Sequence, residues 1–416
     1  MLLVGIDWAD DHHDVCMVDG SCQDACASLA RFRITQSVAG FESLHAKVSE
    51  YETQPDQVFV AIETPHGLLV HDLVRHGYRV YAINPKSVSR YRDRHSAASA
   101  KDDGRDAFTL AHILRTDREH YVALAMQPEQ YRLLDELCQD LRQMIDDRTQ
   151  AINRLTSCLK AYYPQALNLF SRLDSHVSIA FLRAFPEPKS LDTLSKKRFL
   201  AFLKRHQYSH PDRVEHKYEQ LVCAAPAADS VITRSSRMRM LALLDQLTTL
   251  QAHIRTYEQQ IQAIFQELPE SHNISNLPGV GNRIGPELLA TLGPRPQSGE
   301  PSRFASSEGL QRLAGAAPVT RQSGRYKQVI FRRACDRRLR RTLYDWAKTA
   351  TRTSRWANAY YEHCRAHGHR YNTILRNLAI KLIGILYRIW QTGEAYDEQR
   401  HIDNLKARGV AWAAQL

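Results

Sequence analysis

The sequence predicts a multidomain α/β plus α protein with an N-terminal mixed sheet, a long helical arm and a mostly helical C-terminal region. The chain has 416 residues, enough for two or three domains. Its first 120 residues alternate short apolar runs with turn signals, and two later segments repeat apolar residues at steps of three and four. With 43% hydrophobic residues, the chain can bury ordinary cores, which excludes a largely disordered protein.

Five short apolar runs are expected to form the sheet. They are residues 2–7, 13–18, 32–35, 58–62 and 79–83. The first two are close enough to pair as a hairpin, and a helix over about 67–75 separates the last two. This order predicts three antiparallel strands that lead into β-α-β crossovers. A small-residue loop at 96–99 and a helix from about residue 101 are expected next.

Two long helical patterns follow the sheet. The first carries Leu134, Leu137, Leu141, Met144, Ile152, Leu155, Leu159 and Tyr162, and the second carries Leu241, Leu244, Leu247, Ile254, Ile261, Ile264 and Leu268. They predict a coiled-coil or antiparallel arm, with the core helices of a bundle as the alternative. Residues 164–235 are interpreted as an insertion. The expected domains are 1–125, 126–272 and 273–395, followed by a peripheral tail at 396–416.

The charge is distributed unevenly along the chain. The net charge is +11, but residues 1–120 carry 13 Lys+Arg against 18 Asp+Glu, so the remainder has a net charge of +16. Residues 303–341 hold eleven cations and two acids. An acidic first part is suited to gathering carboxylates around a metal, and the basic segment indicates a polyphosphate-binding surface.

Two features bear on the compartment. The start of the chain has no basic segment and meets an acid at Asp7, so no signal peptide is expected, and the longest apolar stretch, 378–390, is interrupted by Lys381 and Arg388. The eight cysteines include no Cys-x-x-Cys pair. We therefore expect a cytoplasmic protein with reduced thiols and no membrane partner.

Four carboxylates are candidate metal ligands. Asp7 and Glu63 each end an apolar strand, and Asp103 and Asp106 are three residues apart on one face of the expected helix. Oxygen donors from two strands and a helix suit Mg²⁺ or Mn²⁺. Helix capping is the alternative role for the two helical acids. Asp10, Asp11 and Asp14 are interpreted as a solvated acidic turn.

These blocks resemble a known family. Gly5-Ile6-Asp7, Ala61-Ile62-Glu63-Thr64 and Lys101-Asp102-Asp103-Gly104-Arg105-Asp106-Ala107 are similar to the three blocks of the DEDD transposases, the insertion-sequence "one-ten" family of bridge-RNA-guided recombinases. Asn84-Pro85 also matches the pattern. The third block assigns the metal-binding acids to Asp103 and Asp106, with Asp102 at the variable position.

The C-terminal part resembles the same family. Leu277-Pro278-Gly279-Val280-Gly281 is similar to its helix-hairpin-helix segment. Ala314-Gly315-Ala316-Ala317-Pro318, followed by Gln322-Ser323-Gly324, is similar to the block that bears the catalytic serine.

The resemblance implies a fold, a chemistry and partners. It implies a RuvC-like, RNase H-type domain that carries Asp7, Glu63, Asp103 and Asp106 around Mg²⁺, and a C-terminal transposase domain with Ser323 as nucleophile. It also implies a structured guide (bridge) RNA, donor and target DNA, and active sites assembled from different protomers of a homo-oligomer, as in a dimer of dimers. A bacterial cytoplasmic protein associated with the nucleoid is expected.

The setting of Ser323 suits this chemistry. Attack on a phosphodiester needs an activated hydroxyl and neutralised phosphate oxygens, and Arg321, Arg325 and Lys327 surround the serine in sequence. The ordinary alternative is a Ser-Gly loop. Further candidate nucleic-acid contacts are Arg332, Arg333, Arg337, Arg338, Arg340 and Arg341, together with Gly279 and Gly281, whose turn can present backbone N–H groups to a phosphate.

Three functions are compatible with these residues. The first is an RNA-guided, metal-dependent recombinase that acts through a phosphoserine. The second is a RuvC-like structure-selective nuclease or resolvase that uses water as nucleophile. The third is a noncatalytic nucleic-acid scaffold. Two other groups, His12-His13 and Cys364 with His367 and His369, are not expected to bind metal, because a turn commonly exposes histidines and no fourth ligand accompanies the cysteine.

Overall fold

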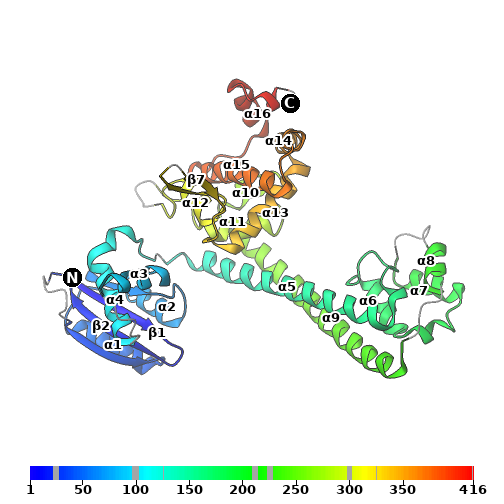
Figure 1. The fold of residues 1–416 in the computed structure, drawn as a ribbon, viewed down its shortest axis with the longest axis horizontal. Coiled ribbons are helices and arrows are strands. Elements are labelled where there is room, and N and C mark those ends of the chain that lie inside the picture. The colour runs from blue at the N-terminus through cyan, green and yellow to red at the C-terminus, as the bar shows by residue number, and fades with distance from the viewer. Residues whose placement is uncertain are drawn as a thin grey trace. The chain divides into compact units, whose positions relative to one another are not determined.

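The chain forms two compact units. The computed structural model describes residues 1–21, 28–95, 103–124, 126–208, 214–222, 228–297, 302–324, 326–414 and 416. The units are Met1–Met126 and Gln127–Leu416 (Figure 1). The loop expected at 96–99 lies outside the described residues, as do Asp102 and Arg325.

A five-stranded mixed sheet forms the centre of the first unit, in the order β3-β2-β1-β4-β5. The strands are β1 (Leu2–Trp8), β2 (His12–Asp19), β3 (Ala30–Thr35), β4 (Val58–Ile62) and β5 (Arg79–Ala82). Strand β2 is antiparallel to both of its neighbours, β1 and β3, whereas β4 is parallel to both β1 and β5. The predicted mixed sheet is therefore confirmed, and the strand boundaries lie within two residues of those expected.

Helices cover both faces of this sheet. They are α1 (Val38–Ser49), α2 (Leu68–Arg75), α3 (Pro85–His95) and α4 (Asp103–Asp117), with short 3-10 turns at Pro55–Gln57 and Arg118–His120. Side chains alternate between the two faces of a strand, so Ile6 of β1 packs with Leu44 of α1 and Leu73 of α2. Leu3 of β1 faces the other way and packs in the same cluster as Leu110 of α4.

Gly5 brings α4 into close contact with the central strand. A Cβ atom at Gly5 would lie 1.9 Å from the carbonyl oxygen of Ala107 and 2.5 Å from the backbone nitrogen of Ala111. Both neighbours belong to the helix backbone, which cannot move aside as a flexible side chain can. Any residue larger than glycine would therefore push α4 away from β1.

Two long antiparallel helices begin the second unit. They are α5 (Glu129–Tyr162) and α9 (Ser230–Glu267), which lie side by side in Figure 1. Leu134 near the start of α5 shares a hydrophobic cluster with Phe265 near the end of α9. Leu159 near the end of α5 shares a second cluster with Met240 near the start of α9. The pair thus contributes to a separate core at each end.

Short helices connect α5 to α9. They are α6 (His176–Ala184), α7 (Lys196–Arg205) and α8 (Val214–Val222), with 3-10 turns at Pro164–Ala166 and Pro188–Leu191. Phe181 and Phe199 are almost completely buried in the cluster that also holds Leu159 and Met240. This segment therefore packs on the far end of the α5–α9 pair.

The rest of the second unit is mostly helical, as predicted. Its elements are α10 (Ser271–Ser275), α11 (Ile284–Leu292), α12 (Ser307–Leu313), β6 (Val319–Ser323), β7 (Tyr326–Ile330), α13 (Arg337–Thr353), α14 (Arg355–Ala366), α15 (Tyr371–Thr392), α16 (Glu398–Ala407) and a 3-10 turn at Ala411–Ala413. Trp346, Trp356 and Trp390 are fully buried in its core. Ile402 of α16 is also fully buried, so the C-terminal segment is docked on the helices. None of the helices in the described part of the chain is long and apolar enough to cross a lipid bilayer.

We expect Gly5→Ala to weaken the packing of α4 on β1, because the added methyl group would overlap the helix backbone. The cost is expected to be about 2 kcal/mol or more of local stability. Hydrogen exchange of peptides that span β1 and α4, followed by mass spectrometry in the full chain, measures this.

Gly384→Ala is the matched control, since Gly384 lies inside α15 and a Cβ there meets nothing within 4 Å. It is expected to leave exchange in β1 and α4 unchanged. Equal protection of β1 in wild type and Gly5→Ala would show that the close contact is not required.

Candidate active site

Two carboxylates lie at the ends of adjacent parallel strands. Ile6 of β1 pairs in register with Ile62 of β4, and Asp7 and Glu63 are the next residues along each strand. Both side chains are half-buried. Asp7 shares its face of β1 with Leu3 and Gly5, which is the face covered by α4. The two carboxylates therefore lie at one edge of the sheet, beneath α4.

Helix α4 brings a third carboxylate to this face. Asp106 precedes Ala107, the residue whose carbonyl contacts Gly5, and is 6% exposed. Its Oδ1 forms an ion pair with Nη2 of Arg92 from α3 at 3.0 Å. Asp103 is the first residue of α4, one turn before Asp106, which places both at the same helix face.

The donor set suits a hard divalent cation. Asp7, Glu63 and Asp106 offer only carboxylate oxygens, which are the ligands that Mg²⁺ and Mn²⁺ prefer. Arg92 supplies a positive charge beside the buried carboxylate of Asp106. The residues present therefore fit a divalent metal.

A further acid faces Asp7 across the sheet. Asp14 lies in β2 and pairs in register with Asp7, so the interpretation that it belongs to a solvated turn is wrong. Its carboxylate accepts hydrogen bonds from Nη2 and Nε of Arg33 at 2.7 and 3.2 Å. Arg33 of the neighbouring strand β3 thus neutralises the charge of Asp14. The alternation of side chains along β2 is the sequence signal that predicts which face of the sheet Asp14 lies on.

His12 and His13 also belong to β2, so the expected turn does not contain them. His13 is fully buried, and its Nε2 lies 2.6 Å from Oε1 of Gln36. Burial lowers the pKa of His13, which keeps the imidazole neutral. A structural role for His13 follows.

Another group of possible metal ligands lies among the helices on the opposite face of the sheet. His45 of α1, Asp72 of α2 and His76, which directly follows α2, have donor atoms within 4.8 Å of one another. Nε2 of His45 is 2.6 Å from Oδ2 of Asp72, and its Nδ1 is 3.0 Å from the hydroxyl of Tyr78. Burial, with a smaller contribution from Asp72, raises the pKa of Tyr78 to about 12. Hydrogen bonds with Asp72 and Tyr78 thus already satisfy both ring nitrogens of His45.

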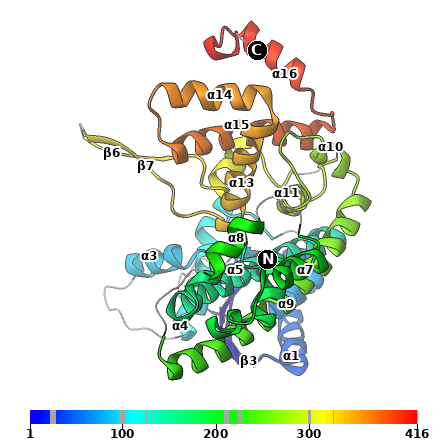
Figure 2. The same ribbon diagram turned by 90° about the vertical axis from the view of Figure 1, so that its right-hand side faces the viewer.

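Ser323 lies in a β-hairpin, where the sequence predicts a loop within a helical region. It is the last residue of β6 and pairs with Tyr326 of β7 across a two-residue turn. Gly324 in that turn has φ of +55°, a left-handed conformation that favours glycine. Figure 2 shows the hairpin projecting from the helices of its own unit. Ser323, Arg321 and Lys327 are all exposed on it.

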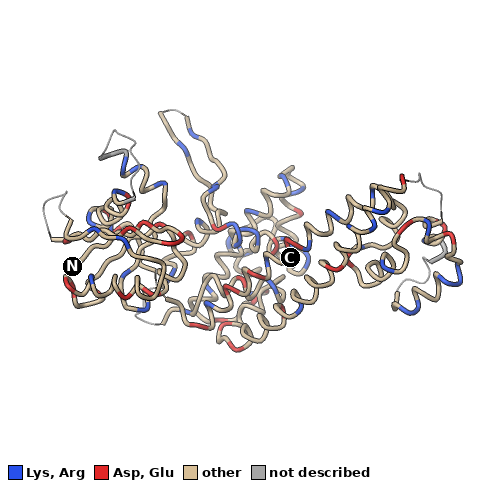
Figure 3. The backbone as a smooth tube through the Cα atoms, turned by 90° about the horizontal axis from the view of Figure 1, so that it is seen from below, with Lys and Arg blue, Asp and Glu red and all other residues tan. Residues whose placement is uncertain are grey.

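Basic residues continue from the hairpin into α13, as the blue segments of Figure 3 indicate. Arg333, Arg337 and Arg341 are exposed, while Arg332 and Arg340 are half-buried. Nε of Arg332 donates to the carbonyl of Ala317 at 3.2 Å. Arg341 forms an ion pair with Asp146 of α5 at 2.7 Å.

Arg338 has a different environment. Its Nη1 donates to the backbone carbonyl of Asp135 in α5 at 3.1 Å, and its Nη2 pairs with the carboxylate of the same residue. The guanidinium thus joins α13 to α5, which assigns Arg338 a packing role.

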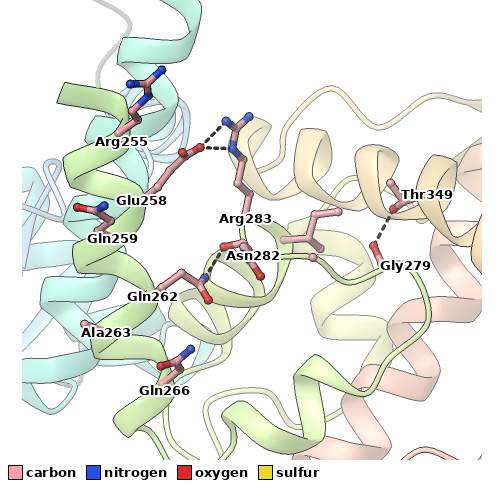
Figure 4. Close-up of a pocket in the computed structure, with 12 residues that line it drawn as sticks. Arg255, Glu258, Gln259, Gln262, Ala263, Gln266, Gly279, Asn282, Arg283 and Thr349 are labelled. Atoms are coloured by element: carbon pink, nitrogen blue, oxygen red, sulfur yellow. Dashed lines mark hydrogen bonds and ion pairs between the residues drawn. The ribbon is translucent and has the colours of Figure 1, made fainter. Parts of the chain in front are cut away.

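The turn that contains Gly279 and Gly281 faces α9 across a cleft of about 790 Å³ (Figure 4). Gly279 has φ of +78°, and a Cβ there would lie 2.6 Å from the backbone nitrogen of Ala350 in α13. At Gly281, by contrast, a Cβ would meet nothing within 4 Å. Gly279 is therefore required for close packing, whereas Gly281 borders open space in the cleft.

Polar contacts hold this turn in place. Nε2 of Gln262 in α9 donates to the carbonyl of Asn282 at 2.6 Å, and Nε of Arg283 donates to Oε1 of Glu258 at 2.7 Å. On the other side, Oγ1 of Thr349 donates to the carbonyl of Gly279 at 2.8 Å.

Comparison with known proteins identifies the class as DNA transposase. Residues 4–164 match the DEDD transposase family of IS110, and residues 271–362 match the transposase IS116/IS110/IS902 family. The two matched ranges contain the carboxylates and the serine hairpin respectively.

Relatives that are similar over more than nine-tenths of the chain support the same family. A candidate transposase of the IS117 mini-circle from Streptomyces coelicolor is 33% identical over 403 residues, which is 95% of each chain. An uncharacterised 44.8 kDa protein of insertion element IS116 from Streptomyces clavuligerus is 26% identical over 92% of this chain and 93% of its own. The chain belongs to the IS116/IS110/IS902 family of insertion-sequence transposases, which confirms the resemblance.

The contrast between Arg338 and the exposed arginines gives a test. We expect Arg338→Gln to lower the free energy of unfolding by about 1 kcal/mol, because it removes a partly exposed ion pair between α13 and α5. The double variant Arg333→Gln/Arg337→Gln should leave stability unchanged but weaken DNA binding at many sequences. The slope of log affinity against log salt should fall by roughly two, about one for each lost phosphate contact.

Chemical denaturation and binding titrations at several salt concentrations measure the two effects. Arg352→Gln, an exposed change at the other end of α13, is the matched control and should alter neither quantity. An unchanged salt slope in the double variant would mean that these arginines are only solvated.

Proposed function

We propose that this transposase exchanges strands between donor and target DNA in an RNA-guided, Mg²⁺-dependent reaction that passes through a covalent phosphoserine at Ser323. The observation that carries the proposal is the arrangement of Asp7 and Glu63 at adjacent strand ends, with Asp106 held against the same face by α4. Acids gathered at one sheet edge are suited to phosphodiester chemistry.

Asp7, Glu63, Asp103 and Asp106 would hold one or two Mg²⁺ or Mn²⁺ ions. Such ions, when bound, help to activate a nucleophile and to stabilise the leaving oxygen of a phosphodiester. Arg92 lies 3.0 Å from Asp106 and would orient this carboxylate. Asp106 is only 6% exposed, so little water reaches its side chain.

Ser323 would act as the nucleophile. Its Oγ loses a proton and forms a bond to the DNA phosphorus, while the bond from phosphorus to the leaving deoxyribose oxygen breaks and that oxygen takes up a proton. The number of phosphate ester bonds is unchanged, so a hydroxyl of a new strand can reverse the step without ATP. Arg321, Arg325 and Lys327 would neutralise the phosphate oxygens during both steps.

The remaining cations and the turn at Gly279 and Gly281 would bind nucleic acid through phosphates. Exposed Arg333, Arg337 and Arg341 and the open space beside Gly281 support this. Family membership supports a structured guide RNA as well as donor and target DNA.

A homo-oligomer, assembled as a dimer of dimers, would bring the serine of one protomer to the carboxylates of another. The exposed position of Ser323 on its hairpin is compatible with this. Action on chromosomal DNA would place the protein in the bacterial cytoplasm with the nucleoid.

A structure-selective nuclease or resolvase is the second candidate. It would use the same carboxylates with water as nucleophile. It would give no protein–DNA adduct, and the energy of the cleaved ester would be lost.

We expect Asp7→Ala and Glu63→Ala to abolish recombination and to weaken Mn²⁺ binding, because each removes an oxygen donor. Ca²⁺ should support DNA binding better than chemistry. Recombination assays and calorimetric Mn²⁺ titration measure these effects, with circular dichroism as the folding control. Asp10→Ala, which changes an exposed acid three residues from Asp7, should leave both unchanged. Full recombination in both Asp7→Ala and Glu63→Ala would contradict the assignment.

The same assay tests which of the adjacent acids Asp102 and Asp103 binds the metal. Asp103→Asn should be severe, since Asp103 and Asp106 lie at one helix face, and Asp102→Asn should be mild. The opposite result would place Asp102 at the metal.

We expect Ser323→Ala to abolish both a covalent DNA adduct and recombinant product while it retains DNA and RNA binding. Reaction with a nicked substrate, denaturation and mass spectrometry of the DNA-linked peptide detect the adduct. Ser307→Ala, at a different site in the second unit, is a control that should form the adduct normally. Recombination by Ser323→Ala at the wild-type rate would refute the serine mechanism and favour the nuclease.

A further inference from the structure

A basic cavity lies between the N-terminal parts of α13 and α15. It measures about 480 Å³ and is lined by Phe331, Arg337, Arg340, Arg341, Tyr344, Asn372, Thr373 and Arg376. Four guanidinium groups therefore border it, and none of its lining residues is acidic. The residues that α15 contributes to the cavity, Asn372, Thr373 and Arg376, lie outside the basic segment 303–341 in the sequence.

One face of α13 supplies half of the lining. Arg337, Arg340, Arg341 and Tyr344 follow the steps of three and four that place residues on the same side of a helix. The first turns of α15 supply Asn372, Thr373 and Arg376. At this end of α15 the cap residue, Arg370, makes no side-chain hydrogen bond to the helix, and the first turn contains no acid. Backbone N–H groups at such a helix start favour an anion.

The four guanidinium groups differ in whether other protein groups pair with them. Arg341 pairs with Asp146, and Arg340 donates to the carbonyls of Ala314 and Arg332. Arg337 and Arg376 form no ion pair with any residue in the described ranges. Arg376 is half-buried, and a partly buried charge without an acidic partner is costly unless an anion binds to it. The cavity is thus suited to a phosphate.

Aromatic rings complete the cavity. Phe331 is 41% exposed, and the guanidinium of Arg340 lies 4.4 Å from its ring centroid. Tyr344 is half-buried, and burial raises its pKa although the nearby Arg376 and Arg340 oppose the rise. Tyr344, Arg340 and Arg376 all line the same cavity. An aromatic wall beside several cations is the arrangement by which proteins bind unpaired nucleotides, with the base on the ring and the phosphate on the cations.

We propose that this cavity binds one unpaired nucleotide of single-stranded RNA or DNA, with its phosphate at Arg337 and Arg376 and its base against Phe331. The volume lies within the range of small-ligand sites, roughly 300–1,000 Å³. A duplex keeps its bases stacked inside, so they cannot enter such a cavity. The inference rests on the proposed action on nucleic acid and adds that the second unit recognises an unpaired strand.

The test is binding of the full chain to a fluorescent oligonucleotide, measured by anisotropy. The probes are single-stranded DNA, single-stranded RNA and duplex DNA of one sequence. Arg376→Gln should weaken single-strand binding about tenfold, and Phe331→Leu should weaken it about fivefold. Both variants should leave duplex binding within about twofold of wild type. Phe331 is exposed, so its replacement leaves the core intact.

Arg352→Gln removes the same charge as Arg376→Gln at an exposed position of α13 outside the cavity, and should change no affinity. The relative loss for RNA and DNA identifies which strand the cavity prefers. Equal losses for single strand and duplex in Arg376→Gln would show an ordinary duplex phosphate contact and overturn the proposal. Unchanged single-strand binding in both variants would also overturn it. Neither outcome depends on Ser323 or the carboxylates, which are tested by adduct formation and recombination.

Discussion

The close contact between Gly5 and α4 is the constraint on which the carboxylate site depends. The missing side chain lets the helix backbone rest on the central strand, with the carbonyl of Ala107 at the position that a Cβ atom would occupy. Asp106 is thereby buried on the face where Asp7 and Glu63 end their strands. Gly5 admits the helix backbone, and Asp7, two residues further along β1, lies on the same face of the strand.

The serine and the carboxylates belong to different units of the chain. Ser323 lies on a two-stranded ribbon whose side chains are nearly all exposed, and such ribbons are marginally stable by themselves. A bound nucleic acid or a second protomer would supply the missing contacts. If Ser323 is the nucleophile, binding of the nucleic acid or of the second protomer would both stabilise the hairpin and position its serine for reaction.

The sequence predicts buried elements better than exposed or tertiary ones. The five strands are predicted because their apolar runs are buried, whereas β6 and β7 bury almost nothing and leave no alternating pattern. Helix α1 is missed because few of its residues, among them Leu44 and Val48, face the core. Strand ends alone predict the positions of Asp7 and Glu63. The pairing of Arg92 with Asp106 and the cavity beside Arg376 depend on contacts between helices, which a linear pattern does not contain.

The α5–α9 pair contributes to a separate hydrophobic core at each of its ends. At 38 residues, α9 spans about 57 Å, so a change in one core has little direct contact with the other. The helices that connect α5 to α9 could therefore accumulate substitutions, or be exchanged for another small fold, while the serine-bearing end keeps its structure. Relatives could in this way acquire new partners at α6–α8 without altering the end of the unit that carries Ser323.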